Sequence, residues 1–240
     1  NGGFTGAPKF PRPVVITFLL RYHARTGNAR AKDMALSTLR AMARGGIRDQ
    51  LDGGFHRYTV DAAWRVPHFE KMLYDQAQLV LAYLEGAQAC GDPFFIEVAE
   101  DTLRYVMREM TSPEGGFLSA EDADSVPPEQ AEDPAAHKSE GAFYLWSAAD
   151  VERLFGPDAA VVRRYFGIEE HGNAPSDPHG EFVDKNILYV AKGLDALAQE
   201  SGRTVEDIVA VLQRARLAQI NPRIVYGSIS GFGQDGPYAD

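Results

Sequence analysis

The stretch RVPHFEKMLYDQAQLVLAYLEG, residues 65–86, changes character partway along. Its first half sets His68, Glu70, Lys71 and Asp75 among aromatic residues, whereas its second half has the apolar content of a buried helix. So many ionisable groups beside an apolar run indicate a wall that a polar ligand touches.

Proline needs no N–H donor at the first position of a helix, so Pro67 predicts a helix start. On that helix His68, Lys71, Asp75 and Gln78 fall on one strip, because they are three or four residues apart. The strip either faces solvent, with Lys71 and Asp75 as a surface pair, or lines a central cavity. The apolar arc covers more than half the circumference of the helix, which favours the cavity.

Apolar periodicity and helix-ending glycines predict further helices. They are expected at residues 13–26, 29–44, 95–110, 148–154, 159–166, 194–200 and 205–217.

The motif GGF occurs at residues 2–4, 53–55 and 115–117, with GAF at 141–143. The spacing suits a repeated pair of helices, and stacked helix pairs form an α/α toroid. The alternative is that each copy is only a tight turn. We expect an all-α fold: a partial toroid of helical hairpins with short β-hairpin insertions.

Composition excludes several classes of protein. With 45% hydrophobic residues the chain can bury a core, and its apolar runs are too short to span a membrane. A net charge of −10 without a basic stripe argues against a nucleic-acid partner. The single Cys90 allows no internal disulfide and suits a reducing, cytoplasmic setting, where we expect a packed thiol.

The loop before the opening stretch is rich in polar and aromatic residues. His56, Arg57, Tyr58, Asp61 and Trp64 would suit sugar binding, since aromatic rings stack on sugars and carboxylates accept their hydroxyls. The alternative is a lid packed by its own aromatic residues.

A second polar concentration, GGFLSAEDADS, holds Glu121, Asp122 and Asp124. Paired carboxylates can act as acid and base, although clustered acids more often face water. The following SEGAFYLW, residues 139–146, has the alternation of a short strand and contains Tyr144. His137, His171 and His179 have no partner at ligand spacing, so we expect neither metal nor cofactor.

Four segments carry a family resemblance: GGFTGAPKFPRP (2–13), ALSTLRAMARGGIRDQLDGGFHRYTVDAAWRVPHFEKMLYDQAQL (35–79), SPEGGFLSAEDADS (112–125) and SEGAFYLW. Together they resemble the family of spermatogenesis-associated protein 20 and bacterial thioredoxin-domain proteins. The resemblance implies a thioredoxin-like domain upstream, followed by an (α/α)6 barrel related to six-hairpin glycosidases and N-acylglucosamine 2-epimerases. Residues 1–216 would be the first part of that barrel. Asp52 stands where the resemblance implies glycine, a poorer choice if the position has positive φ.

The tail INPRIVYGSISGFGQDGPYAD, residues 220–240, departs from this family and resembles a segment of class III CoA-transferases. We treat residues 217–240 as an unrelated, poorly ordered tail joined to the barrel, with strand propensity over 223–229.

The leading functional hypothesis is a sugar isomerase or hydrolase, inactive as this fragment. The candidate acid–base residues are His68, Glu70, Asp75, Glu121 and Asp122, and the candidate ligand-binding residues are His56, Arg57, Tyr58, Trp64, Lys71, Asp124 and Tyr144. The alternatives are a non-catalytic scaffold for the thioredoxin-like domain and a CoA-transferase fragment. Half a toroid would expose apolar helix faces, so oligomers are also expected.

Overall fold

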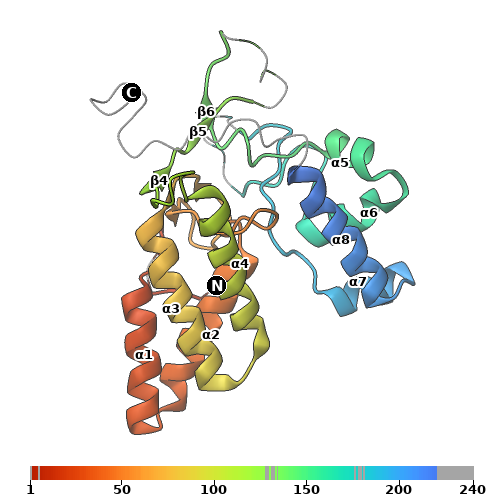
Figure 1. Cartoon of the computed structure of the whole chain (residues 1–240). Coiled ribbons are helices and arrows are strands. Elements are labelled where there is room, and N and C mark those ends of the chain that lie inside the picture. The colour runs from red at the N-terminus through yellow and green to blue at the C-terminus, as the bar shows by residue number, and fades with distance from the viewer. Residues whose placement is uncertain are drawn as a thin grey trace.

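The computed structural model describes residues 2–4, 6–127, 130, 133, 135–175, 177, 180 and 182–220, with the backbone alone at 217–220. Two helical hairpins form its first half (Figure 1). They are α1 (Pro13–Thr26) with α2 (Ala29–Arg44), and α3 (Leu73–Cys90) with α4 (Pro93–Glu109).

Local sequence sets the ends of these helices. Gly27 ends α1 in the left-handed region, with a φ of 72°. The Asn28 side chain accepts a hydrogen bond from the Ala31 N–H at 3.0 Å and caps α2. Asp92 caps α4 in the same way, and Pro93 follows it at the first helical position. The helix bounds expected from periodicity are therefore confirmed for α1 and α2.

The core of the first half lies between the four helices and the loop that joins the hairpins. Phe55 and Trp64 from that loop are completely buried with Leu39, Tyr83 and Phe95. The Tyr83 hydroxyl donates to the Leu39 carbonyl at 2.8 Å, so the phenol is buried without an unpaired donor. Because the loop fills the core of the bundle, its backbone is fixed by packing.

Short antiparallel strand pairs cap one end of the bundle. β1 (Tyr58–Thr59) pairs with β2 (Pro67–His68), β3 (Lys71–Met72) with β4 (Ala120–Glu121), and β5 (Asp124–Ser125) with β6 (Ser139–Glu140). The pair β3–β4 places Lys71 opposite Glu121. The pair β3–β4 joins the loop between the two hairpins to the segment that follows α4.

The predicted helix start at Pro67 is wrong. Pro67 and His68 lie in β2, Lys71 lies in β3, and α3 begins only at Leu73. Backbone pairing with distant segments overrides the local helix signal here. The strand predicted for 139–146 is also shorter than expected, because β6 ends at Glu140 and a turn follows.

A second group of helices follows: α5 (Ala148–Phe155), a 3₁₀ turn (Gly156–Asp158), α6 (Ala159–Phe166), α7 (Leu194–Ser201) and α8 (Val205–Ile220). Each helix predicted in this region is present. α5, α6, α7 and α8 gather in a separate group (Figure 1). Their apolar faces form a core around Trp146, Val162, Phe166 and Leu197. Leu51, from the loop after α2, belongs to this core and links it to the first half.

An ion-pair cluster also links the two halves. Asp101 of α4 is 7% exposed and accepts hydrogen bonds from Arg48 and from Arg216 of α8, both at 2.5 Å. The Arg216 Nε atom also donates to the Leu51 carbonyl at 2.8 Å. Arg216 is the last residue before the predicted tail, and the α8 backbone continues to Ile220. Residues 221–240 lie outside the described residues, so the predicted strand propensity at 223–229 remains a prediction.

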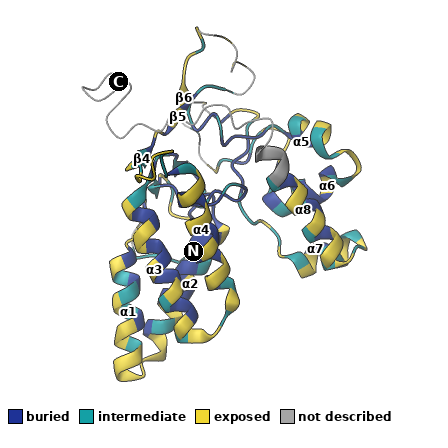
Figure 2. Cartoon of the chain, in the orientation of Figure 1, coloured by how far each residue is buried: buried dark blue, intermediate teal, exposed yellow. Residues whose placement is uncertain are grey.

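The described residues therefore form a mostly helical fold of packed helix pairs with two-stranded sheets, and closure into a toroid remains a prediction. Apolar side chains stay exposed along α1, α3 and α4 (Figure 2), including Val14, Phe18, Leu81 and Met107 at 60–69%. No helix of the described part is long and apolar enough to cross a membrane.

Two smaller expectations need correction. Cys90, expected to be packed, is exposed at the end of α3. Asp52 is not among the described residues with positive φ, so it carries none of the strain considered for that position. Instead, its carboxylate accepts a hydrogen bond from Arg108 at 2.6 Å.

We predict that Asp101→Ala lowers the free energy of unfolding by about 2–4 kcal/mol, because two arginines lose their shared, buried counter-charge. Urea unfolding of the whole chain measures this loss. The control is Arg104→Ala, which breaks the exposed pair with Glu100 (65% and 55% exposed) and should cost less than about 1 kcal/mol. Equal effects of the two variants would contradict the bridging role of Asp101.

Candidate functional site

The extended segment 67–72 sends alternate side chains to opposite sides, as a strand does. Phe69 is 1% exposed and Lys71 is not exposed at all, whereas His68 and Glu70 are partly exposed. The single helical strip expected from the sequence is therefore divided. Lys71 faces the interior, and His68 and Glu70 lie on an outer, half-buried face.

Lys71 is the centre of a buried charge cluster made of Asp49, Lys71, Tyr105, Glu121 and Tyr144. Its Nζ atom donates to Asp49 Oδ2 at 3.0 Å and to the Gly53 carbonyl at 3.1 Å. The same ammonium lies 4.2 Å from the ring centre of Tyr105 and 4.9 Å from that of Tyr144. Two hydrogen bonds and two cation–π contacts compensate for its loss of water.

Glu121 is the second carboxylate of this cluster. Opposite residues of an antiparallel pair project to the same face, so the Lys71–Glu121 register brings their charges together. The hydroxyls of Tyr105 and Tyr144 both donate to the Glu121 carboxylate. Gly54 allows this arrangement: its φ is 76°, and a Cβ there would lie 2.5 Å from the Tyr105 ring.

The charges of the cluster stabilise one another. Burial alone would lower the pKa of Lys71, but Asp49, Glu121 and Asp52 outweigh that effect and raise it. Burial likewise opposes ionisation of Asp49, yet the Lys71 ammonium holds the Asp49 pKa below its usual value. Burial and the Glu121 charge raise the pKa of both tyrosine hydroxyls. Lys71 is thus a charged counter-ion and not a neutral amine nucleophile.

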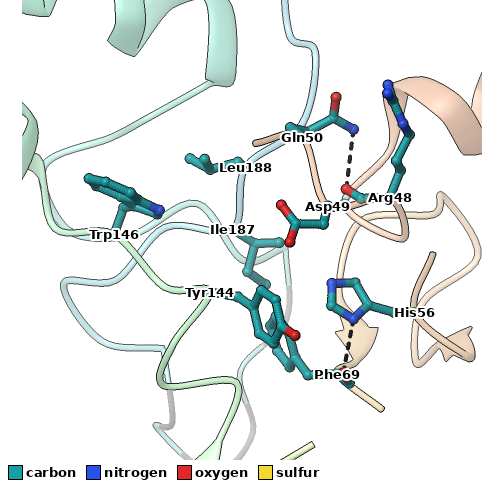
Figure 3. A pocket seen from close by; sticks show the side chains of 10 residues that line it. Arg48, Asp49, Gln50, His56, Phe69, Tyr144, Trp146, Ile187 and Leu188 are labelled. Atoms are coloured by element: carbon teal, nitrogen blue, oxygen red, sulfur yellow. Dashed lines mark hydrogen bonds between the residues drawn. The ribbon is translucent and has the colours of Figure 1, made fainter. Parts of the chain in front are cut away.

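His56 lies beside the cluster in a small pocket (Figure 3). Its Nδ1 atom donates to the Phe69 carbonyl at 3.0 Å, which leaves Nε2 with the lone pair on the side that faces Asp49. Burial and the Lys71 charge lower the pKa of His56 to about 3, so the ring is neutral. The pocket volume of about 20 Å³ is room for one water molecule, not for a sugar.

The outer face, which we call the polar face, consists of Arg57, Tyr58, His68, Glu70, Asp75 and Glu140. Arg57 donates to Glu70 at 2.7 Å, and His68 Nδ1 donates to Glu140 at 2.7 Å. The Tyr58 ring stacks on the His68 ring, with 5.0 Å between the ring centres. The Phe10 ring also stacks on Tyr58, with 4.7 Å between the ring centres. Acid–base groups and exposed aromatic surface therefore lie together.

Asp75 differs from the other members of the polar face. It lies in the first turn of α3 and is 8% exposed, and its Oδ2 atom has no hydrogen-bond partner among the described residues. Burial raises the pKa of Asp75 to about 6, a shift that the Arg57 charge opposes and the Glu70 charge increases. The Nε atom of Arg57 is also buried and has no hydrogen-bond partner in the described part of the chain. These two orphan atoms mark the face as incompletely satisfied.

The structure places the predicted site residues in four different settings: the exposed surface, the apolar core, the buried charge cluster and the polar face. Asp122 and Asp124 are exposed, and Asp122 lies 3.7 Å from Lys138. Trp64 is fully buried, with the Lys9 ammonium 4.5 Å above its ring, so it belongs to the core. His56, Lys71, Glu121 and Tyr144 meet at the buried charge cluster, whereas Arg57, Tyr58, His68, Glu70 and Asp75 meet on the polar face.

Sequence reasoning missed Asp49, Tyr105 and Glu140. Asp49 and Glu140 stand inside the quoted motifs, GGIRDQLDGGF and SEGAFYLW, so their polar character was a usable signal. Tyr105 gave none, because it lies on the apolar face of α4. Among the described residues, no group of three or more His, Cys, Asp or Glu side chains could hold a metal ion. His179 lies outside those residues.

We predict that Lys71→Met lowers the free energy of unfolding by about 3–5 kcal/mol, because Asp49 and Glu121 become buried charges without a counter-ion. Denaturant unfolding at neutral pH tests this. Adding Asp49→Asn to that variant should restore part of the loss. Lys138→Met is the exposed control and should cost less than about 1 kcal/mol. A Lys71→Met protein as stable as wild type would show that the cluster contributes nothing.

A second prediction concerns pH. Because the Asp75 pKa of about 6 exceeds its ordinary value, the folded protein binds a proton that the unfolded chain has released. The contribution of Asp75 to the free energy of unfolding therefore falls as the pH rises from 4 to 6, and it stays low above pH 6. The free energy of unfolding of Asp75→Asn, measured relative to wild type, should rise by about 1 kcal/mol from pH 4 to pH 7, after allowance for solvent screening. Asp33→Asn, at an exposed position, should show no such gain in urea unfolding.

Comparison with known proteins gives long matches to several relatives and one short match to a family profile. The chain is 45% identical to spermatogenesis-associated protein 20 of Homo sapiens over 227 residues, which is 88% of this chain and 28% of that protein. The Mus musculus protein is 44% identical, again over 88% of this chain and 28% of the relative. An uncharacterized protein of Caenorhabditis elegans is 35% identical over 93% of this chain and 33% of its own length.

The profile match is short. The profile of CoA-transferase family III matches residues 209–240, and residues 221–240 of that range lie outside the described part of the structure. The chain spans about 28% of the length of the mammalian relatives. On the long match, the chain is homologous to a segment of spermatogenesis-associated protein 20.

Proposed function

We propose that this segment supplies one wall of a carbohydrate-active barrel, a sugar isomerase or hydrolase in the complete protein. The observation that carries the proposal is Asp75, a carboxyl that is 8% exposed and has an unpartnered oxygen beside the Arg57–Glu70 ion pair. A desolvated carboxyl with a pKa near 6 can hold and release a proton at neutral pH.

The polar face divides into roles that suit this chemistry. Asp75 is the proton donor and acceptor, and Glu70, ion-paired with Arg57, is the charged carboxylate. Tyr58 is stacked between Phe10 and His68, which orients the imidazole, and Phe10, 42% exposed, supplies the aromatic surface for a sugar ring. His68, fixed by Glu140, can exchange a proton with a sugar hydroxyl.

The buried charge cluster supports the polar face without touching a ligand. Lys71 is adjacent in sequence to Glu70, and it is held by Asp49 at 3.0 Å. Fixing Lys71 therefore fixes the backbone that presents His68 and Glu70 on the opposite side. On this proposal His56, Glu121 and Tyr144, assigned from sequence to direct ligand or proton contact, are positioning residues.

The chain spans 28% of the length of its mammalian relatives. The remaining walls would come from the rest of the complete protein, which on the family resemblance also carries the thioredoxin-like domain. The single cysteine of the chain suits the reducing, cytoplasmic setting that we propose for it.

One observation favours a second function, a non-catalytic scaffold. Val14 and Phe18 of α1 and Leu81 of α3 are 60–69% exposed, which is the character of a surface that another domain covers. A scaffold needs no acid–base pair, so ligand binding separates the two functions.

The test uses the complete protein that contains this chain and a panel of monosaccharides, with binding followed by thermal shift. We expect at least one sugar to raise the melting temperature, because a ligand that binds only the folded state stabilises it. Asp75→Asn and His68→Ala should abolish the shift, and Glu100→Gln, at an exposed position, should leave it. A panel without any shift would favour the scaffold.

A further inference from the structure

The small pocket beside the buried charge cluster has walls of two kinds (Figure 3). Phe69, Ile187 and Leu188 give it apolar sides, whereas Asp49 and His56 bring polar atoms to it. Asp49 is 7% exposed and His56 is 2% exposed, so both side chains are shielded from bulk water. The pocket volume of about 20 Å³ exceeds the roughly 10–15 Å³ that one water molecule needs, and it is too small for a larger ligand.

His56 turns a hydrogen-bond acceptor toward this pocket. Its Nδ1 atom lies 3.0 Å from the Phe69 carbonyl oxygen, which can only accept, so the proton of the neutral ring is on Nδ1. The Nε2 atom therefore carries a lone pair, on the side of the ring that faces Asp49 (Figure 3). Among the described residues no side chain or backbone group donates to this lone pair.

Asp49 presents a second acceptor to the same pocket. Its Oδ1 atom accepts from the Leu51 and Asp52 N–H groups, and its Oδ2 atom accepts from Lys71, all at 3.0 Å. A carboxylate has about four lone-pair sites, so these three bonds leave one site open. Two acceptors cannot bond to each other, and in the described structure no direct hydrogen bond joins Asp49 to His56.

We infer that the pocket binds one water molecule, which donates one hydrogen to His56 Nε2 and the other to the Asp49 carboxylate. Water has two O–H donors for these two acceptors, and its size matches the cavity. A metal cation in its place would be repelled by the Lys71 ammonium, which lies 3.0 Å from the same carboxylate. A dry pocket would leave a buried acceptor without a donor, which costs free energy.

The water has a structural role that is independent of any sugar chemistry. It joins Asp49 to His56, whose Nδ1 atom in turn holds the carbonyl of Phe69. Phe69 lies between His68 and Glu70 in the chain. The water therefore extends the buried charge cluster to the backbone that presents the polar face.

The first test is a crystal structure of the whole chain at a resolution that shows ordered water. We expect one water peak within about 3.2 Å of both His56 Nε2 and an Asp49 carboxylate oxygen. His56→Phe keeps a flat ring but removes the acceptor, so its crystal structure should lack this peak. The matched control is His171→Phe, at a side chain that is 89% exposed, and it should leave the peak in place.

The second test uses nuclear magnetic resonance of the unmodified chain in solution at pH 7. Long-range ¹H–¹⁵N spectra should show the His56 proton on Nδ1 and none on Nε2. The carbon-bound hydrogens beside Nε2 should show a nuclear Overhauser contact to a long-lived water, whereas the exposed His171 ring should show none.

Two results on the unmodified chain would overturn the inference. One is a pocket without a water peak, and the other is a proton on Nε2 that bonds directly to Asp49. A water that keeps its place in His56→Phe would show that His56 is not its partner. If that variant does not fold, the crystal structure and the spectra of the unmodified chain decide the matter alone.

Discussion

The buried Lys71 ammonium is the constraint on which the rest of the structure depends. It is 0% exposed, and a charge so placed requires counter-charges and acceptors within reach. These come from separate parts of the chain: Asp49 and Gly53 from the loop after α2, Tyr105 from α4, and Glu121 from β4. Satisfying one ammonium thus fixes the loops of both helical hairpins against each other.

The same lysine determines which side chains reach the outer face. Because the backbone around it is extended, placing Lys71 inward turns Glu70 and His68 outward, where Arg57 and Glu140 meet them. A shift of one residue would bury Glu70 and expose Lys71, and it would remove both sets of contacts. The same strand register therefore determines both the buried charge cluster and the polar face.

The helices were predictable from sequence because their signals are local. Apolar periodicity and the helix-ending glycines predicted α1, α2 and α4 within a residue or two. The start of α3 was not predictable, because it depends on Lys71 pairing with Glu121, which lies far along the chain. Most candidate site residues were identified from motif composition, but their division between interior and surface depended on the same distant pairing. Tyr105 was missed since an aromatic residue on an apolar helix face gives no polar signal.

Lys71 and Asp75 are both buried, but they differ in how many of their polar atoms have a partner. Lys71 has two hydrogen bonds and two aromatic faces, whereas Asp75 keeps an oxygen without a partner in the described structure. An unpaired buried acceptor costs about 1–3 kcal/mol, and folding alone gains nothing from it. In the described structure Arg48 Nε and Trp64 Nε1 are unpaired as well. Asp75 differs from them because it is a carboxyl whose pKa burial raises to about 6, and this is the property on which the proposed acid–base role rests.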